Sequence, residues 1–253
     1  MTSAQLEQTE ALRGDRHVAR KEEIPTDPDP GNYVVVDVMH FSTTVVELLE
    51  NGAEYVHVTD ERGDEFDFRD DNPGARIGGG STDDYEPTDG YDFFNSPSYV
   101  QRVDVAGRPV SMTSTNGGQA VVALRDAPGV DVYVGTTTNA AALARHLRGT
   151  DRPTYLVSAG SGGEEAIEDH LGAALVARYL DGAALLDVEE TIYRGVLEVA
   201  KGHDYVDSHE RRRRDVRDYV LALNERAVVP RLDGDRLVDA AAAATRPPTS
   251  ASD

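Results

Sequence analysis

Tyr33-Val-Val-Val-Asp-Val-Met-His-Phe-Ser-Thr-Thr44 is the stretch that decides the fold. Its first five residues form a short, unbroken β-branched run that ends in an acid, which is typical of a strand buried in a parallel sheet. Ser42 or Thr43 can then open a helix, which Asn51-Gly52 would end. The stretch therefore predicts a buried strand that leads directly into a helix.

The same alternation continues along the chain. Further strands are predicted at 55–58, 109–112, 131–134 and 154–157. Further helices are predicted at 119–125, from the turn at 135–139 through residue 148, and at 164–180. Strands and helices that alternate at this spacing predict an α/β fold with three layers, α/β/α, around a largely parallel sheet.

One unit of strand, turn, helix and strand resembles another unit 76 residues later, because Val34 falls on Val110 and Val56 on Val132. Any two βαβ units share such an apolar pattern, so an internal duplication and a chance likeness both remain open. A true duplication would set two similar halves face to face, with a site between their equivalent turns.

The two ends of the chain differ from its body, which is predicted to span residues 33–239. Residues 1–32 show no helical or strand period and end in the proline-rich stretch Pro25–Gly31, so they are predicted to form a flexible extension. Residues 240–253 run through alanines to Pro247-Pro248 and are predicted to form a frayed tail.

Composition excludes several classes of protein. The 253 residues include no cysteine, which rules out disulfides, thiolate metal sites and a cysteine nucleophile. No apolar run approaches the roughly 20 residues of a membrane span, and the N-terminus lacks the apolar core of a signal peptide, so a cytoplasmic location is expected. The formal charge of −21 repels nucleic acid and anionic membranes, so neither is expected as a partner. Only two of the 25 cations are lysines, which predicts a halophilic protein adapted to molar salt.

Small polar residues follow four of the predicted strands, at the edge where ligands bind in parallel α/β sheets. Hydroxyls, amides and backbone N–H groups at helix N-termini suit an anion. The same residue types cap helices and form turns in proteins of every function, so a single such turn indicates nothing. The candidate anion-binding residues are His40, Thr43, Thr44, Thr115, Asn116, Gly117, Thr137, Asn139, Gly160 and Ser161.

Acids near these turns are candidate metal ligands. Asp37 ends an apolar strand, where a carboxylate is costly unless something binds it, although a helix cap or a structural hydrogen bond is the alternative. Glu168 and Asp169 lie in the first two turns of the helix predicted at 164–180, where acids also favour the helix dipole. Oxygen ligands without thiols suit Mg²⁺ better than zinc or iron.

The face that these two acids occupy follows from the buried stripe of their helix. The stripe is predicted to consist of Ile167, Leu171 and Leu175. Glu168 then lies about 100° from the stripe, toward a crevice at the sheet edge, and Asp169 lies nearer solvent. No P-loop lysine, D-x-D pattern or nucleophile-elbow serine is present, so no covalent nucleophile is predicted.

Seven short motifs occur in a fixed order between Tyr33 and Asp239. They are Asp37-Val-Met-His-Phe-Ser-Thr-Thr44, Gly90-Tyr-Asp-Phe-Phe-Asn-Ser-Pro97, Thr113-Ser-Thr-Asn-Gly117, Gly135-Thr-Thr-Thr-Asn139, Ser158-Ala-Gly-Ser-Gly-Gly163, Ile167-Glu-Asp169 with Gly172-Ala173, and the late segment 218–230. In this order they resemble the 2-phosphosulfolactate phosphatase family. The resemblance implies Mg²⁺-dependent hydrolysis of 2-phospho-3-sulfolactate to 3-sulfolactate and phosphate, a step toward coenzyme M, on an α/β/α architecture.

The resemblance also implies roles for individual residues. Asp37, Glu168 and Asp169 would hold the metal and, with Asn116, form the catalytic set, and a water molecule activated by the metal would be the nucleophile. Asn95 and Ser96 would join the substrate-binding residues. The expected partner is a small phosphorylated (sulfo)acid, and a homo-oligomer is left open.

Two positions depart from the family's pattern. The family usually has arginine where this chain has His40, and Glu-Arg where it has Gly80-Ser81. These departures remove two bidentate anion clamps, for which Arg76 is one candidate replacement. The alternative hypotheses are therefore an anion-binding homologue with an altered substrate or lost activity, and a structural protein with an empty cleft.

Overall fold

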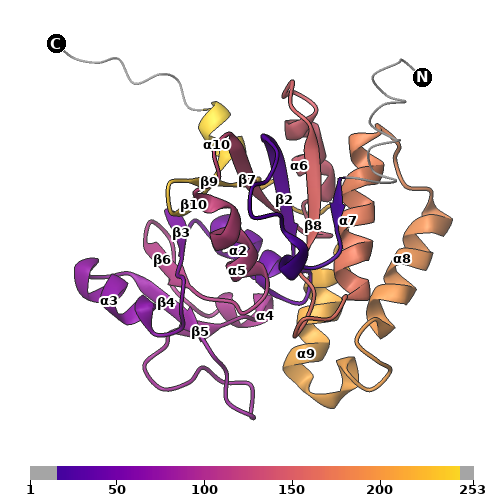
Figure 1. Ribbon diagram of the computed structural model, residues 1–253. Helices are drawn as coiled ribbons and strands as arrows, with labels where there is room; N and C mark the ends of the chain where they lie inside the picture. Colours follow the sequence, from indigo (N-terminus) through magenta and orange to yellow (C-terminus); the bar gives the residue numbers. More distant parts are fainter. Residues whose placement is uncertain (1–15, 246–253) are drawn as a thin grey trace.

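Residues 16–245 are described by a computed structural model, in which one ten-stranded sheet has the order β1-β8-β2-β7-β9-β10-β3-β6-β4-β5 (Figure 1). The strands are β1 His17–Val18, β2 Gly31–Val36, β3 Tyr55–Val58, β4 Arg76–Gly79, β5 Phe93–Phe94, β6 Pro109–Met112, β7 Val130–Gly135, β8 Thr154–Ser158, β9 Pro230–Asp233 and β10 Arg236–Asp239. The α-helices are α2 Phe41–Glu50, α3 Asp64–Asp71, α4 Pro97–Val100, α5 Gly117–Arg125, α6 Ala140–Leu147, α7 Ile167–Leu180, α8 Asp187–Val199, α9 Glu210–Arg214 and α10 Ala240–Thr245. Short 3-10 helices at Lys21–Glu23 and Val206–Ser208 and a π-helix at Asp215–Val220 complete the elements.

The sheet consists of two parallel blocks that run in opposite directions. Strands β1, β8, β2 and β7 form the first block, and β3, β6, β4 and β5 form the second. The hairpin β9–β10 lies between them and is antiparallel to both of its neighbours, β7 and β3. The prediction of a largely parallel sheet is confirmed.

Strand β2 is buried along its whole length because it contributes to two hydrophobic cores. Successive side chains of a strand point to opposite faces. Tyr33 and Val35 therefore belong to the central core with α2 and α5, whereas Val34 and Val36 belong to the outer core with α6 and α7. This double burial explains why the strand is an unbroken apolar run in the sequence.

The second block is also covered on both faces. Val56 and Val58 of β3 lie in the central core. His57 points the other way and stacks on Phe68 of α3, with ring centroids 4.5 Å apart. Together with the helices on both faces of β2, this packing confirms the α/β/α layering.

The two units that resemble each other in sequence cross the sheet in opposite directions. The unit β2-α2-β3 runs from the first block to the second, and β6-α5-β7 runs from the second block back to the first. Their helices α2 and α5 contact each other within the central core (Figure 1). The topology thus sets the two units face to face, which is the arrangement that an internal duplication would give.

Part of the predicted N-terminal extension belongs to the folded body. His17 and Val18 pair with β8 as strand β1, and the backbone N–H of Lys21 donates to the carbonyl oxygen of Ala159 at 3.2 Å. Residues 1–15 lie outside the described residues. In the predicted tail, residues 240–245 form α10, and residues 246–253 lie outside the described part. Between residues 16 and 245, no helix combines the length and apolar character that a bilayer span requires.

Candidate functional site

A pocket of about 210 Å³ lies where the turns that follow several strands meet. It is smaller than the roughly 300–1,000 Å³ of sites for drug-sized ligands, so it suits a small acid. Five of the predicted site residues line it: Asp37, His40, Asn95, Thr115 and Asn116. Asp37 follows β2 and Asn116 follows β6, so the equivalent turns of the two similar units do meet at one site.

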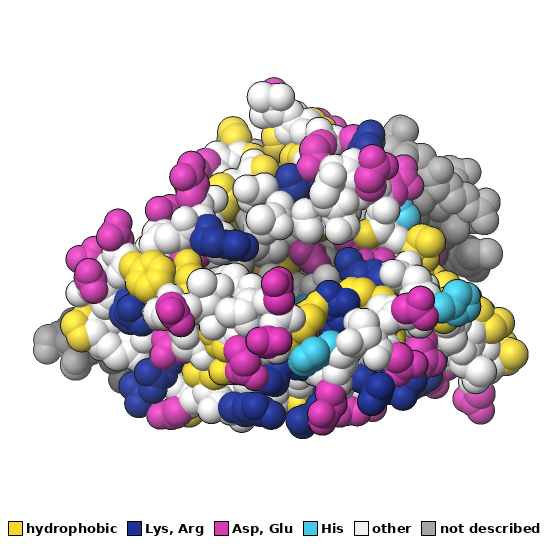
Figure 2. All heavy atoms as spheres, turned by 90° about the horizontal axis from the view of Figure 1, so that it is seen from below, with side chains coloured by type: hydrophobic (Ala, Val, Ile, Leu, Met, Phe, Trp, Pro, Cys, Tyr) yellow, Lys and Arg dark blue, Asp and Glu magenta, His cyan; other side chains and the backbone are white. Residues whose placement is uncertain are grey.

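A second, larger hollow of about 360 Å³ lies beside the β9–β10 turn. Its lining includes Arg125 and Asp235 but none of the polar turns that follow the parallel strands. Ligands of α/β sheets bind at those strand ends, so we take the smaller pocket as the candidate site. Figure 2 views the molecule from below, the side on which α4 and α9 lie in Figure 1, and shows acidic and basic side chains interspersed across this face.

Asp37 is fixed at the pocket wall by the turn after β6. The backbone N–H of Gly117, at the start of α5, donates to Asp37 Oδ2 at 2.9 Å. A Cβ atom at position 117 would lie 2.4 Å from the Phe41 ring and 2.8 Å from Asp37 Cβ. Only glycine therefore allows the two turns to approach closely enough for this hydrogen bond.

Helix α7 brings two more carboxylates to the same end of β2. Gly172 of α7 packs so closely on β2 that a Cβ atom there would lie 2.8 Å from Val36 of that strand and 2.7 Å from Val38 just beyond it. One turn earlier, Asp169 accepts hydrogen bonds from the backbone N–H groups of Val38 at 2.8 Å and Gly160 at 3.0 Å. Asp169 thereby ties α7 and the loop after β8 to the end of β2.

The predicted buried face of α7 is wrong for its first turn, although Leu175 is buried and Leu171 packs against the outer core as predicted. Ile167, assigned to the buried stripe, is 56% exposed, whereas Glu168 is 3% exposed and Asp169, predicted to lie nearer solvent, is 2% exposed. The helix begins at Ile167 rather than Glu164, and its first turn lies against the end of β2. Two backbone N–H groups there bind Asp169, so polar contacts rather than apolar packing orient this turn.

Lys201 neutralises one of the three buried carboxylates. Its Nζ lies 2.8 Å from Glu168 Oε1. Its charge also acts on Asp37 and Asp169. Three buried carboxylates thus share one ammonium group, which leaves an excess of acidic groups beside the pocket.

The crowding and burial of these carboxylates shift the pKa values of two of them. Burial raises the pKa of Asp37 above its ordinary value, against the opposing hydrogen bond from Gly117 and the charge of Lys201. Burial and then the neighbouring charge of Asp37 raise the pKa of Asp169 well above its ordinary value. Positive charge placed among these groups would lower both pKa values.

The donor set fits Mg²⁺ through two of the three predicted ligands. Within residues 16–245, no three His, Cys, Asp or Glu side chains are grouped as a preformed metal site. Mg²⁺ is usually bound by one or two carboxylates together with water and substrate phosphate, so a preformed cage is not required. Asp37 and Glu168 suit this role, whereas both oxygens of Asp169 already accept backbone hydrogen bonds.

His40 is partly buried at the N-terminus of α2. Its Nε2 lies 3.2 Å from the Tyr205 hydroxyl, and its Nδ1 has no hydrogen-bond partner within the described part of the chain. Burial lowers the pKa of the imidazole. His40 is therefore neutral at pH 7 and offers a hydrogen-bonding atom, not a positive charge, to a ligand.

Several other predicted residues are bound to protein atoms away from the pocket. Thr43 Oγ1 donates to Val38 O at 2.8 Å, and Thr137 Oγ1 donates to Val220 O at 2.7 Å. Asn139 Nδ2 donates to Val228 O at 3.1 Å, and Ser96 Oγ donates to Asp215 at 2.8 Å. Outside the pocket lining, Thr44 is buried within α2, Gly160 donates to Asp169, and Ser161 is exposed on the loop after β8.

Sequence reasoning missed Arg62 and Tyr85, which also line the pocket. Arg62 follows β3, so the rule that ligands bind beyond strand ends could have identified it. Tyr85 lies in the connection between β4 and β5, which carries no sequence signal of this kind. Arg76, considered as a replacement cation, instead pairs with Asp92 at 3.6 Å and is absent from the lining.

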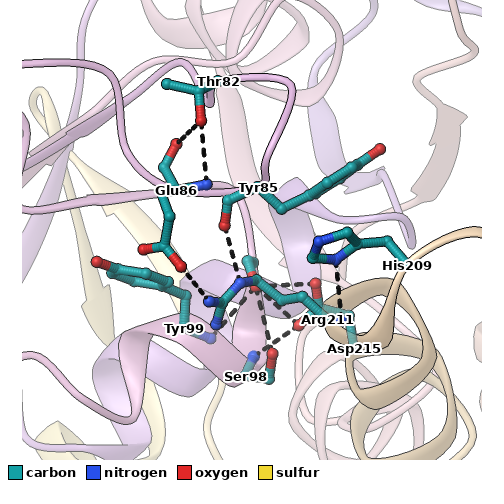
Figure 3. Close-up of polar contacts among 9 residues, drawn as sticks. Thr82, Tyr85, Glu86, Ser98, Tyr99, His209, Arg211 and Asp215 are labelled. Atoms are coloured by element: carbon teal, nitrogen blue, oxygen red, sulfur yellow. Dashed lines mark hydrogen bonds and ion pairs between the residues drawn. The ribbon is translucent and has the colours of Figure 1, made fainter.

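The segment that carries Tyr85 is fastened to α9 (Figure 3). Arg211 Nε donates to Tyr85 O at 2.9 Å, and its Nη2 lies 2.6 Å from Glu86 Oε1. The Tyr85 ring stacks on His209 with centroids 4.5 Å apart. Arg211 therefore holds one wall of the pocket.

Arg212 lies beside this wall. Its guanidinium carbon is 4.5 Å from the centre of the Tyr85 ring and 4.4 Å from that of Tyr205. Such cation–π contacts hold both rings in place. Since Tyr205 also contacts His40, the C-terminal segment supports the pocket from two directions.

The fold and the pocket define an α/β protein with a small polar pocket at its strand ends, backed by buried carboxylates. A sequence model of the 2-phosphosulpholactate phosphatase family matches residues 18–211. This match covers most of the chain, and the chain belongs to that family.

Individual relatives agree with this assignment. A protein of Symbiobacterium thermophilum is 31% identical over 150 residues, which are 59% of this chain and 63% of the relative. A protein of Deinococcus radiodurans is 34% identical over 159 residues, which are 62% of this chain and 65% of the relative. Both carry the name "Probable 2-phosphosulfolactate phosphatase". The match spans less than two thirds of the length of these two relatives.

Proposed function

We propose that this protein is a Mg²⁺-dependent phosphatase that hydrolyses 2-phospho-3-sulfolactate to 3-sulfolactate and phosphate. Family membership supports the reaction class. The observation that carries the proposal is the position of Asp37, a buried carboxylate with a raised pKa, on the wall of a pocket whose lining includes many hydroxyl, amide and glycine residues and one arginine, Arg62. A carboxylate in that setting needs a cation, and a phosphate ester supplied with Mg²⁺ brings one.

Each group of residues then has a distinct task. Asp37 and Glu168 would hold Mg²⁺, which supplies positive charge that stabilises the phosphoryl group in the transition state. Asn116 and Thr115 offer amide and hydroxyl donors to the phosphate oxygens from the start of α5. Asp169 acts indirectly, because its two backbone hydrogen bonds position the end of β2 and therefore Asp37.

The test of the assigned role is Asp37→Asn. We expect this variant to release phosphate at least about 100-fold more slowly, since it loses the carboxylate charge at the pocket wall. Phosphate release would be measured in molar KCl with Mg²⁺, and circular dichroism would check that the variant is folded. Asp126→Asn is the matched control, because the Asp126 side chain is 90% exposed and lies outside the pocket.

Near-native turnover by Asp37→Asn would contradict the role given to this carboxylate. A wild-type protein that binds the substrate but turns over no phosphate ester would instead support the alternative of an anion-binding homologue. This alternative is favoured by His40, whose pKa is lowered by burial, at the position where the family pattern has a positively charged arginine.

A further inference from the structure

Arg62 is an arginine at the edge of the candidate site that has no hydrogen-bond or ion-pair partner among residues 16–245. It is one of the residues that line the pocket. Neighbouring arginines are paired: Arg125 lies 2.9 Å from Asp60, and Arg76 lies 3.6 Å from Asp92. Arg62 is exposed, and its guanidinium group has free donors for a ligand.

The wall opposite this side chain leaves room for it. A Cβ atom on Gly80 would lie 3.1 Å from Arg62 Nη1 and 3.5 Å from its guanidinium carbon. The absence of a side chain at Gly80 therefore lets the guanidinium group lie against the pocket wall formed by residues 79–81. That wall belongs to the segment whose far end, at Tyr85 and Glu86, is held by Arg211 (Figure 3).

Arg62 is also the one permanently charged cation among the residues that line this pocket. His40 is neutral because burial lowers its pKa. Lys201 is absent from the pocket lining, and its Nζ pairs with Glu168 Oε1 at 2.8 Å. Arg62 is therefore the cation available to an acidic group of the ligand that neither the metal nor the polar turns bind.

We propose that Arg62 binds a second acidic group of the substrate, a sulfonate or a carboxylate, and so selects phosphate esters that carry one. The planar fork of arginine matches the paired oxygens of either group. This proposal rests on the proposed function for the identity of the substrate, but the binding of the second acidic group does not require turnover.

The test is equilibrium binding to wild-type protein and to Arg62→Gln, by calorimetry in molar KCl. The probes are 3-sulfolactate, lactate and inorganic phosphate. We expect Arg62→Gln to bind 3-sulfolactate about 10- to 100-fold more weakly, the loss typical of a charged hydrogen bond, and to bind inorganic phosphate within about 2-fold of wild type. Arg62→Lys, which keeps the charge but loses the fork, should fall between the two. Arg125→Gln removes an arginine that is paired with Asp60 and lies outside the pocket lining, so this variant should bind like wild type.

The probes also separate the two acidic groups. If lactate binding is unaffected by Arg62→Gln, Arg62 binds the sulfonate. If Arg62→Gln weakens the binding of lactate as much as that of 3-sulfolactate, Arg62 binds the carboxylate. The proposal would be overturned if Arg62→Gln weakened the binding of inorganic phosphate as much as that of 3-sulfolactate, or if it left the binding of 3-sulfolactate unchanged. It would also be overturned if the wild-type protein did not bind 3-sulfolactate. Selective binding without any phosphate release would leave it standing and would contradict the proposed hydrolysis alone.

Discussion

Gly117 shows how one residue can control the geometry of the whole pocket. Its backbone N–H binds Asp37, and its missing side chain lets the turns after β2 and β6 touch. The sequence indicated both turns and gave Asp37, Asn116 and Gly117 as site residues. It did not single out Arg62, although its place after β3 could have identified it, because an arginine among many acids is more often paired on the surface than free in a pocket.

Gly117→Ala should therefore damage both stability and function. The added methyl group would overlap the Phe41 ring and the Asp37 side chain, which should lower the free energy of unfolding by about 1–3 kcal/mol. Phosphate release should fall as well, because Asp37 would move. Denaturant unfolding and the phosphate assay would measure the two effects.

Gly195→Ala in α8, where nothing lies within 4 Å of the added atom, should be neutral or slightly stabilising. An equally harmless Gly117→Ala would contradict this account of the turn.

His40 should make stability depend on pH. Its pKa is lowered in the folded protein but takes its ordinary value of about 6.5 in the unfolded chain, so below pH 6.5 the unfolded chain gains a proton first. The free energy of unfolding should therefore fall as pH drops from 7.5 to 5.5, with a contribution from His40 of at most about 1.4 kcal/mol for each pH unit below 6.5.

His40→Gln removes this titration while it keeps a group able to bond Tyr205. Denaturant unfolding at both pH values should show a smaller loss of stability in the variant than in wild type. Identical losses in the two proteins would mean that His40 is not held neutral by the fold.

At the scale of elements, strands were easier to predict than the orientation of helices. The predicted strands 55–58 and 109–112 coincide with β3 and β6 because short β-branched runs between turns have few alternatives. The first turn of α7 was assigned the wrong face because its position depends on Asp169 and the backbone of Val38, which is 131 residues away in sequence. The connection from β4 to β5 was also beyond sequence reasoning, since Arg211 holds it from the far end of the chain.

Arg211 should act as a positioning residue for that connection. Arg211→Ala removes the contacts with Tyr85 O and Glu86, so the Tyr85 wall should become more mobile. We expect KM to rise several-fold with a smaller change in kcat, and faster hydrogen exchange in residues 81–87. Arg213→Ala, which removes an exposed pair with Asp207, is the control. Unchanged exchange in residues 81–87 would show that Arg211 does not hold the wall.

At the scale of the whole molecule, the fold class and the parallel sheet followed from the alternation of strands and helices. The antiparallel hairpin β9–β10 that joins the two blocks did not, because its strands lie in a region without a clear period. The pairing of the two similar units across α2 and α5 also needed the structure, since sequence likeness alone left the duplication open.

The charge of −21 should make the protein depend on salt. Like charges repel over a Debye length of about 10 Å at 0.1 M salt and about 3 Å at 1 M, so salt should relieve self-repulsion in the folded state. We expect Tm to rise steadily from 0.1 to 2 M KCl. A Tm that stays constant or falls would contradict the prediction of a halophilic protein.

We propose above that the pocket hydrolyses a phosphate ester with the help of Mg²⁺. The most direct measurement is phosphate release by the wild-type protein from 2-phosphosulfolactate and from a panel of phosphorylated small acids, in molar KCl with Mg²⁺ or with a chelator. We predict release from 2-phosphosulfolactate that stops when the metal is chelated. A folded protein that releases no phosphate from any of these esters would contradict the claim.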